Sequence, residues 1–228
     1  MATASAPTHE HHHAPAHYTT TGLPHNKIAM WAFIGSECLL FASLISTYLV
    51  YKGRSIVGPY PHEYWCRATG VIQNTPIANC PPAELFNPIL NIPVTSASTF
   101  VLLMSSLAMV LAHAAVERSD QKYSKIWLAV TALLGATFLG FQAYEFTSFV
   151  HEGLTIRTNL FGSTFFTLTG FHGAHVTAGV MWLTTLLFID FKRGLEPRDA
   201  INVDLCALYW HFVDVVWIAI FTLVYLIQ

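Results

Sequence analysis

Charged residues are scarce in this chain of 228 residues: Asp, Glu, Lys and Arg make up 11% of it, against 54% hydrophobic residues. Soluble domains carry about 25% charged residues, so this composition favours an integral membrane protein. The formal net charge is -2. Because the chain lacks the basic excess with which proteins attract nucleic-acid phosphates, we expect no nucleic-acid partner.

Cysteine is also scarce, with four residues and no CxxC or CxxCH motif. Covalent haem attachment and a redox dithiol therefore have no support. Cys38 and Cys206 lie in or beside apolar runs, where cysteine packs as a small hydrophobic residue. Cys66 and Cys80 share one polar loop, and a disulfide can form there if the loop faces an oxidising compartment. Such a bridge would close about 15 residues and stabilise the loop by roughly 3 kcal/mol.

The first 26 residues are polar and rich in His, Thr, Ala and Pro. They lack the apolar core of a cleavable signal peptide. The segment HEHHHAPAH is compatible with metal binding, but we interpret it as part of a solvated tail. The chain thus divides into a tail at 1–26 and a membrane domain at 27–228.

Long apolar stretches fill most of the membrane domain. Each reaches the roughly 20 residues that a helix needs to cross about 30 Å of hydrocarbon. In lipid such stretches must be helical, because a helix satisfies its own backbone hydrogen bonds. We predict an all-α polytopic membrane bundle with five transmembrane helices, at 28–51, 92–116, 125–150, 160–191 and 205–227.

The orientation follows from the basic residues outside these stretches. If the N-terminus is inside, the inner segments hold Lys27, Arg118, Lys122, Lys125, Lys192, Arg193 and Arg198, and the outer segments hold Lys52, Arg54, Arg67 and Arg157. An excess of inner basic residues predicts N-in and C-out. The loop at 53–91, with its two cysteines, would then lie on the oxidising side.

Small residues recur on two of the predicted helices. One set is Ser98, Ser105, Ala108, Ala112 and Ala115, and the other is Gly170, Ala174 and Ala178. Small residues at such spacing let helices approach closely. We interpret both sets as packing surfaces within this chain rather than as oligomerisation motifs.

Ionisable residues inside the apolar stretches are costly in lipid unless something pairs with them. They are Glu37, His172, His175, His211 and Asp214. A rise of about 1.5 Å per residue places all five at a similar depth. The three-residue separations put His172 with His175, and His211 with Asp214, on one helix face each. We predict one carboxylate and imidazole network joining the first, fourth and fifth helices.

A structural role ranks first for this network, because strong hydrogen bonds offset desolvation and fix which helix faces meet. A proton-related role ranks second, since imidazoles and carboxylates titrate readily. Haem ligation by His175 and His211 ranks third, because one facing pair is a weak signal. A metal-transport site ranks last, since it needs several converging ligands.

Glu145 stands apart, because it falls roughly 30 Å along the third predicted helix, near the outer interface. We interpret it as an interfacial anchor that pairs with His151 or Arg157.

The fourth and fifth predicted helices contain FGSTFFTLTGFHGAHVTAG and YWHFVDVVW. The first three contain SECLLFASLISTY, NPILNIPVTSASTFVLLMSS and FQAYEF. In this order, the segments together resemble subunit III of the haem-copper terminal oxidases. The resemblance runs from Lys27 to Tyr225 apart from the loop after the first helix.

The resemblance implies a non-catalytic subunit with no haem, copper or other cofactor of its own, packed against the catalytic subunit I that carries those centres. It also implies contact with subunit II and other respiratory subunits, support of sustained turnover and proton uptake, and bound phospholipid. By motif position, Glu37 corresponds to the buried carboxylate associated with proton uptake. Recurrent polar positions of the family correspond to Glu145, His172, His175, His211 and Asp214.

The five-helix form lacks the first helix pair of seven-helix members, which implies a bacterial inner membrane. Cytochrome c is the preferred electron donor of the expected complex, with subunit III of a quinol oxidase as the alternative. An independent transporter and a diheme cytochrome subunit remain competing interpretations.

Overall fold

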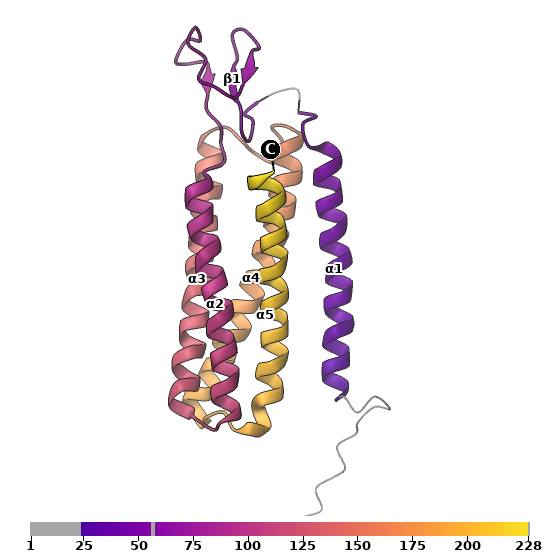
Figure 1. The fold of residues 1–228 in the computed structure, drawn as a ribbon, viewed down its shortest axis with the longest axis vertical. Coiled ribbons are helices and arrows are strands. Elements are labelled where there is room, and N and C mark those ends of the chain that lie inside the picture. Colours follow the sequence, from indigo (N-terminus) through magenta and orange to yellow (C-terminus); the bar gives the residue numbers. More distant parts are fainter. Residues whose placement is uncertain (1–23, 56–57, 228) are drawn as a thin grey trace, which may run out of the picture.

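The computed structural model describes residues 24–55 and 58–227. Five long helices run side by side along the molecule (Figure 1). They are α1 (His25–Tyr51), α2 (Ile92–Glu117), α3 (Gln121–His151), α4 (Leu160–Arg193) and α5 (Ala200–Phe221). A short 3-10 helix, η1 (Pro197–Asp199), precedes α5, and a π-helical turn, η2 (Thr222–Leu226), follows it. The five α-helices are all long and apolar enough to cross a membrane, which confirms the predicted five-helix membrane fold.

The helices extend beyond the apolar stretches that predicted them. Helix α3 begins at Gln121 rather than 125, because Asp120 caps it by accepting a hydrogen bond from the Tyr123 amide. Helix α1 begins at His25, inside the predicted tail, while residues 1–23 lie outside the described residues. Hydropathy marks the length in hydrocarbon, whereas the capping residue sets where the helix begins.

The connection between α1 and α2 holds a small antiparallel sheet that was not predicted. Its strands are β1 (Tyr64–Cys66), β2 (Ile72–Gln73) and β3 (Leu85–Phe86), in the order β2-β1-β3. Trp65 pairs with Ile72 on one side and with Phe86 on the other. Cys66 forms a disulfide with Cys80, 14 residues away. Strands of two or three residues are too short to show an alternating pattern in the sequence.

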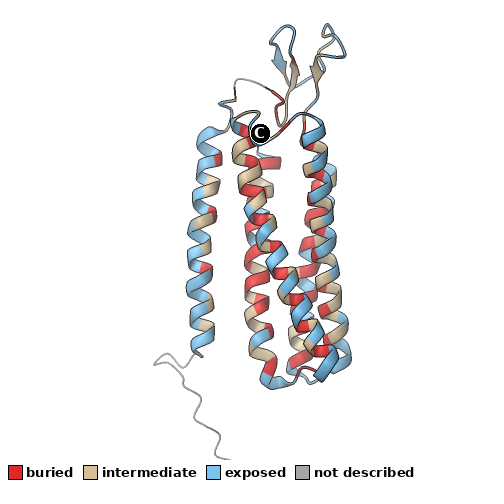
Figure 2. Ribbon diagram, turned by 180° about the vertical axis from the view of Figure 1, so that it is seen from behind, coloured by how far each residue is buried: buried red, intermediate tan, exposed pale blue. Residues whose placement is uncertain are grey.

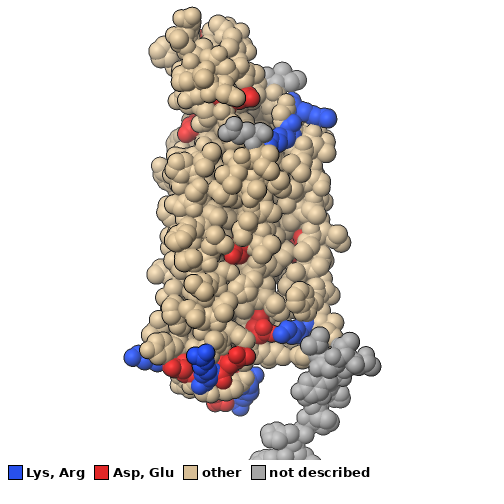
Figure 3. Space-filling model, viewed as in Figure 1, with Lys and Arg blue, Asp and Glu red and all other residues tan. Residues whose placement is uncertain are grey.

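This sheet lies at what we call the loop end of the bundle, with the C-terminus close by (Figure 1). The start of α1 and the α2–α3 and α4–α5 connections lie at the opposite end, which we call the tight-turn end. Lys and Arg side chains cluster at the two ends, and the surface between them is almost free of charge on the face shown in Figure 3. That uncharged belt is what a bilayer requires.

Trp210 of α5 is the centre of the packed core and is 1% exposed. A Cβ atom at Gly135 of α3 would lie 2.6 Å from its ring, and one at Gly179 of α4 would lie 2.7 Å from it. Its indole N–H donates to Ser105 Oγ of α2 at 3.0 Å. One side chain therefore joins four helices, and the glycines provide the space that it fills.

Helix α1 packs against α4 and α5 through a narrow strip. Its buried residues, Ile34, Phe41 and Tyr48, recur at seven-residue intervals, the spacing of a helix that touches its partners along one seam. Figure 2 shows most of the remaining surface of α1 as exposed. Near its ends, Lys27 forms an ion pair with Asp204 at 2.8 Å, and Lys52 donates to the Ile227 carbonyl.

The two sets of small residues, both predicted to be helix-packing surfaces, differ in whether they are buried. The set on α2 is buried, as predicted: Ser98, Ser105, Ala108, Ala112 and Ala115. The packing prediction for α4 is wrong, because Ala174 and Ala178 are exposed and no atom outside their own helix approaches the Cβ position of Gly170. Helix α4 instead packs closely at Gly179, whose Cβ position lies 2.7 Å from the Trp210 ring of α5 and which lies on the opposite face from Gly170.

Candidate functional site

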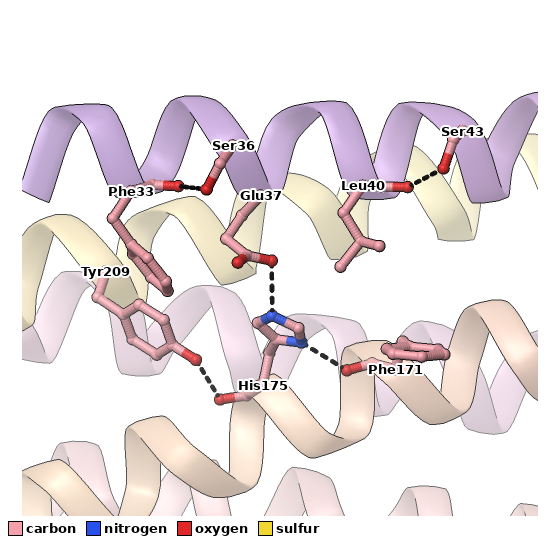
Figure 4. Close-up of polar contacts among 8 residues, drawn as sticks. All are labelled: Phe33, Ser36, Glu37, Leu40, Ser43, Phe171, His175 and Tyr209. Atoms are coloured by element: carbon pink, nitrogen blue, oxygen red, sulfur yellow. Dashed lines mark hydrogen bonds and ion pairs between the residues drawn. The ribbon is translucent and has the colours of Figure 1, made fainter.

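Glu37 of α1 and His175 of α4 form the most direct polar link between α1 and the rest of the bundle. Glu37 Oε2 lies 3.1 Å from His175 Nε2, and the two side chains are 18% and 17% exposed. Figure 4 shows them pointing toward one another across the helix pair. This contact confirms that Glu37 and His175 share a depth.

The second ring nitrogen of His175 is also engaged. Its Nδ1 lies 2.7 Å from the Phe171 carbonyl, which can only accept, so Nδ1 carries a proton. The contact with Glu37 is then a hydrogen bond in one of two directions: Nε2–H donates to the carboxylate, or a protonated carboxyl group donates to Nε2.

Tyr209 of α5 completes this cluster. Its hydroxyl group donates to the backbone carbonyl of His175 at 2.9 Å, and its ring stacks on that of Phe33 at a centroid distance of 6.3 Å. Glu37, His175 and Tyr209 thus bring together α1, α4 and α5 (Figure 4).

His172 lies one turn away but belongs to a different environment. It is 0% exposed and packs among the rings of Phe41, Phe138 and Trp217. Its Nε2–H donates to the Val213 carbonyl at 3.2 Å, and no described residue bonds to its Nδ1. His172 therefore joins α4 to α5 without contacting a carboxylate.

His211 and Asp214 face α2. His211 Nδ1 lies 2.6 Å from Ser106 Oγ. Asp214 lies beside the same serine, while its Oδ1 is buried and receives no hydrogen bond from the described residues. Both residues share a helix face, as predicted, but that face meets α2 rather than α1 or α4.

The predicted single network is therefore wrong in its connections. The five residues divide into the pair Glu37–His175, the aromatic-packed His172, and His211 with Asp214 beside Ser106. Spacing along a helix identifies a shared face but does not say which helix that face meets.

The haem-ligation interpretation loses its geometric basis. His175 turns toward α1 and engages both ring nitrogens, while His211 turns toward α2. In the part of the chain that the structure describes, no three His, Cys, Asp or Glu side chains come close enough to hold a metal ion.

Glu145 does not pair with His151 or Arg157, so the prediction of an interfacial ion pair is wrong. It is 5% exposed and accepts a hydrogen bond from Thr95 of α2 through Oε1. Tyr225, which is 1% exposed, lies beside both residues. The α3 helix turns Glu145 inward toward α2, which its position along the sequence could not reveal.

Sequence reasoning also missed a buried carboxylate at the tight-turn end. Asp190 is 0% exposed, accepts from Ser124 Oγ at 2.6 Å, and accepts from the Leu195 amide at 2.9 Å. It fastens the end of α4 to α3 and to the turn before α5. The available signal is an acidic residue inside the fourth predicted span, at 160–191.

A family model described as cytochrome c oxidase subunit III matches residues 5–228. The cytochrome c oxidase subunit 3 of Bacillus sp. (strain PS3) is 38% identical over 213 residues, covering 93% of this chain and 91% of that protein. The quinol oxidase subunit 3 of Bacillus subtilis (strain 168) is 38% identical over 218 residues, covering 96% and 95%. The probable quinol oxidase subunit 3 of Staphylococcus saprophyticus is 37% identical over 202 residues, covering 89% of each.

These matches span the five helices and the connections between them. The chain therefore belongs to the cytochrome c oxidase subunit III family, whose members are subunits of haem-copper terminal oxidases.

Proposed function

We propose that this chain is a non-catalytic subunit that stabilises a proton-pumping terminal oxidase and supports its proton uptake. The observation that carries the proposal is the contact of 3.1 Å between Glu37 Oε2 and His175 Nε2, midway along two membrane-spanning helices. Ionisable groups at this depth are costly and mark proton paths in many membrane proteins.

The physical role of the pair follows from its two proton arrangements. A carboxyl group and an imidazole that share a proton can accept one from a neighbouring group and release it elsewhere. Because each side chain is nearly one-fifth exposed, the pair lies at the surface of the bundle, where a neighbouring subunit can reach it. The same contact stabilises α1, whose apolar seam is narrow.

The proposed electron donor of the complex is cytochrome c, and a quinol is the second candidate. The relatives support both, since subunits of both oxidase types are 38% identical to this chain. The purified complex should oxidise reduced cytochrome c faster than a quinol. The opposite preference would assign the chain to a quinol oxidase.

The haems and copper of the proposed complex belong to its catalytic subunit I. Neighbouring subunits, subunit II among them, would cover part of the exposed apolar surface, with phospholipid over the rest. The bacterial relatives support a place in a bacterial inner membrane.

We also propose that the tight-turn end faces the cytoplasm. It holds seven of the eleven lysines and arginines of the chain, and cytoplasmic segments carry such an excess. A membrane-impermeant thiol reagent applied to intact spheroplasts tests this orientation with single cysteines at Thr69 and Ser119. It should label position 69 and leave position 119 unlabelled until the membrane is opened.

An independent transporter is the competing function. Reconstitution of the chain alone into liposomes separates the two: transport activity without any partner would contradict a subunit role.

A further inference from the structure

Ser106 of α2 and His211 of α5 bring a polar group to the surface of the bundle, each near the middle of its helix. His211 Nδ1 lies 2.6 Å from Ser106 Oγ. The second ring nitrogen of an imidazole also donates or accepts a hydrogen bond, yet no described residue bonds to His211 Nε2. The ring is half-buried and its Nε2 is not enclosed by the protein, so this nitrogen reaches the surface.

Asp214 belongs to the same polar group. It is 5% exposed and lies beside Ser106, while its Oδ1 is buried and receives no hydrogen bond from the described residues. Ser106 has a single hydroxyl proton, so it cannot donate to both His211 and Asp214. The three residues therefore make fewer hydrogen bonds among themselves than their atoms allow. In hydrocarbon such a deficit is costly.

Apolar side chains surround this polar group. Helix α5 packs against α1, α2 and α4, and α1 and α2 lie on its two sides in Figure 1. On the side of α5 that these helices leave uncovered, Val215 and Ile218 are 63% and 40% exposed. On α2, Leu103 and Val110 lie one turn before and after Ser106 and are 37% and 50% exposed. Membrane helices associate through such close packing together with hydrogen bonds between helices.

The outer faces of α3 and α4 satisfy their exposed polar groups differently. Thr137 of α3 and Thr177 and Thr184 of α4 each donate to the carbonyl four residues earlier in their own helix, at 2.7 to 2.8 Å. These hydroxyl groups need nothing from a neighbour, so lipid tails can cover them. His211 Nε2 has no such partner, and a lipid tail offers none.

We propose that the face around Ser106 and His211, which we call the α2–α5 face, binds a membrane-spanning helix of the haem-bearing subunit. That helix carries a hydrogen-bonding side chain near its midpoint, which contacts His211 Nε2. The occupant is a helix because other backbone conformations leave polar groups unsatisfied at this depth. The inference rests on the proposed subunit role, and it specifies which side of the chain meets the partner.

A photoreactive amino acid placed at single positions in the assembled complex shows what covers each face. Val215 of α5 and Met181 of α4 form a matched pair, because they are 63% and 66% exposed and both lie in membrane-spanning helices. Position 215 should cross-link to a membrane-spanning peptide of the haem-bearing subunit, with a polar residue near the middle of that span. Position 181 should form no cross-link to protein.

The outcomes separate this inference from the subunit role itself. A chain that purifies without any companion contradicts the subunit role. The α2–α5 face is contradicted instead if the companion is present but position 215 cross-links only to lipid or to a second copy of the chain. A cross-link to the haem-bearing subunit that is no stronger from position 215 than from position 181 also contradicts it.

Bulky substitutions test the same face without changing the interior. Val215→Trp should lower the amount of haem-bearing subunit recovered with the affinity-tagged chain about tenfold, because overpacking weakens the contact. Met181→Trp, its control, should leave recovery unchanged. Equal recovery in these two variants would overturn the proposal.

His211→Phe tests the polar contact, because it keeps an aromatic ring but removes both ring nitrogens. Loss of one hydrogen bond between membrane helices should lower recovery of the haem-bearing subunit about threefold. Thr177→Val, whose hydroxyl group bonds only within its own helix, should have no effect. Thermal unfolding checks that each variant remains folded, and Val215→Trp keeps the test valid if His211→Phe does not. A folded His211→Phe chain with unchanged recovery would show that Nε2 has no partner in the complex and would overturn the polar contact.

Discussion

Glu37 and His175, 138 residues apart in the chain, meet at 3.1 Å and join α1 to α4 in the membrane-spanning part of the bundle. The α1 interface also includes an apolar seam of buried residues at seven-residue intervals and one polar contact near each end of the helix. The pair therefore links α1 to α4 where the apolar contacts of α1 are sparse, and it is also the site of the proposed proton-related role.

Replacing Glu37 separates these two roles. Glu37→Gln keeps a hydrogen-bonding side chain but removes the carboxyl proton, whereas Glu37→Ala removes both. Interhelical hydrogen bonds in membranes contribute on average about 0.6 kcal/mol, so we expect Ala to lower the unfolding temperature of the complex slightly and Gln to lower it less. Both variants should reduce the number of turnovers before inactivation. They should also slow proton uptake, which a pH dye measures in single-turnover experiments.

Ser36→Ala is the matched control for these variants. Ser36 precedes Glu37, but its hydroxyl group donates only to the Phe33 carbonyl of its own helix. It should leave turnover and proton uptake unchanged. Normal proton uptake and turnover lifetime in both Glu37 variants would remove the pair from the mechanism.

The glycines around Trp210 can be tested by adding one methyl group. Gly179→Ala would place its Cβ atom 2.7 Å from the indole ring, and such overpacking typically costs about 1–3 kcal/mol. At Gly140 no atom outside its own helix lies within 4 Å of the Cβ position, so Gly140→Ala should be neutral or stabilising through helix propensity. Thermal unfolding of the two variant complexes should differ accordingly, and equal unfolding temperatures would show that Trp210 moves freely.

The sequence predicts where residues lie along each helix, but not which neighbouring helix each face contacts. Apolar length predicts the five spans, and rise per residue places Glu37 and His175 at one depth. The spacing of residues along a helix does not determine how the helix is rotated about its own axis. For this reason His211 and Asp214 were predicted to meet α1 and α4, whereas they face Ser106 of α2.

Long-range pairing explains the other differences. The partner of Glu145 is Thr95, which lies 50 residues away on α2. Nothing in the sequence near either residue indicates that the two meet. Likewise, β1 pairs with strands of two residues, whose existence depends on pairing and on the disulfide rather than on local preference.

The loop should detach from the bundle in mildly acidic conditions. His62 Nε2–H donates to the Val224 carbonyl at 3.2 Å. Burial lowers the pKa of His62 below 6.5, and Lys52 lowers it further, although the Val224 carbonyl and Glu63 oppose the shift. Above pH 6.5 the docked and undocked histidines are both neutral, so docking is at full strength. As the pH falls through 6.5, the undocked form binds a proton more readily, and docking weakens.

Hydrogen exchange of residues 58–66, corrected for the intrinsic effect of pH, measures this dependence. Exchange should be faster below pH 6.5 than above it, and His62→Gln should remove most of the difference. An equally strong pH dependence in His62→Gln would assign it to another group.

Removal of the disulfide should loosen the same loop locally. The double variant Cys66→Ser with Cys80→Ser opens the loop that the disulfide closes between two residues 14 positions apart. A disulfide that closes a loop of this size contributes about 3 kcal/mol to stability. We expect faster hydrogen exchange in β1 and β2, with exchange in α2 to α5 unchanged. Equal loss of protection throughout the bundle would show that the loop holds the helices together.

Purification of the affinity-tagged chain from its native membrane in mild detergent tests the central claim most directly. The account predicts that a large haem-bearing subunit accompanies the chain, that the complex shows haem bands in a reduced-minus-oxidised spectrum, and that those bands remain with the partner when the chain is dissociated. A chain that leaves the membrane without a haem-bearing companion, or that retains a haem band by itself, would contradict it.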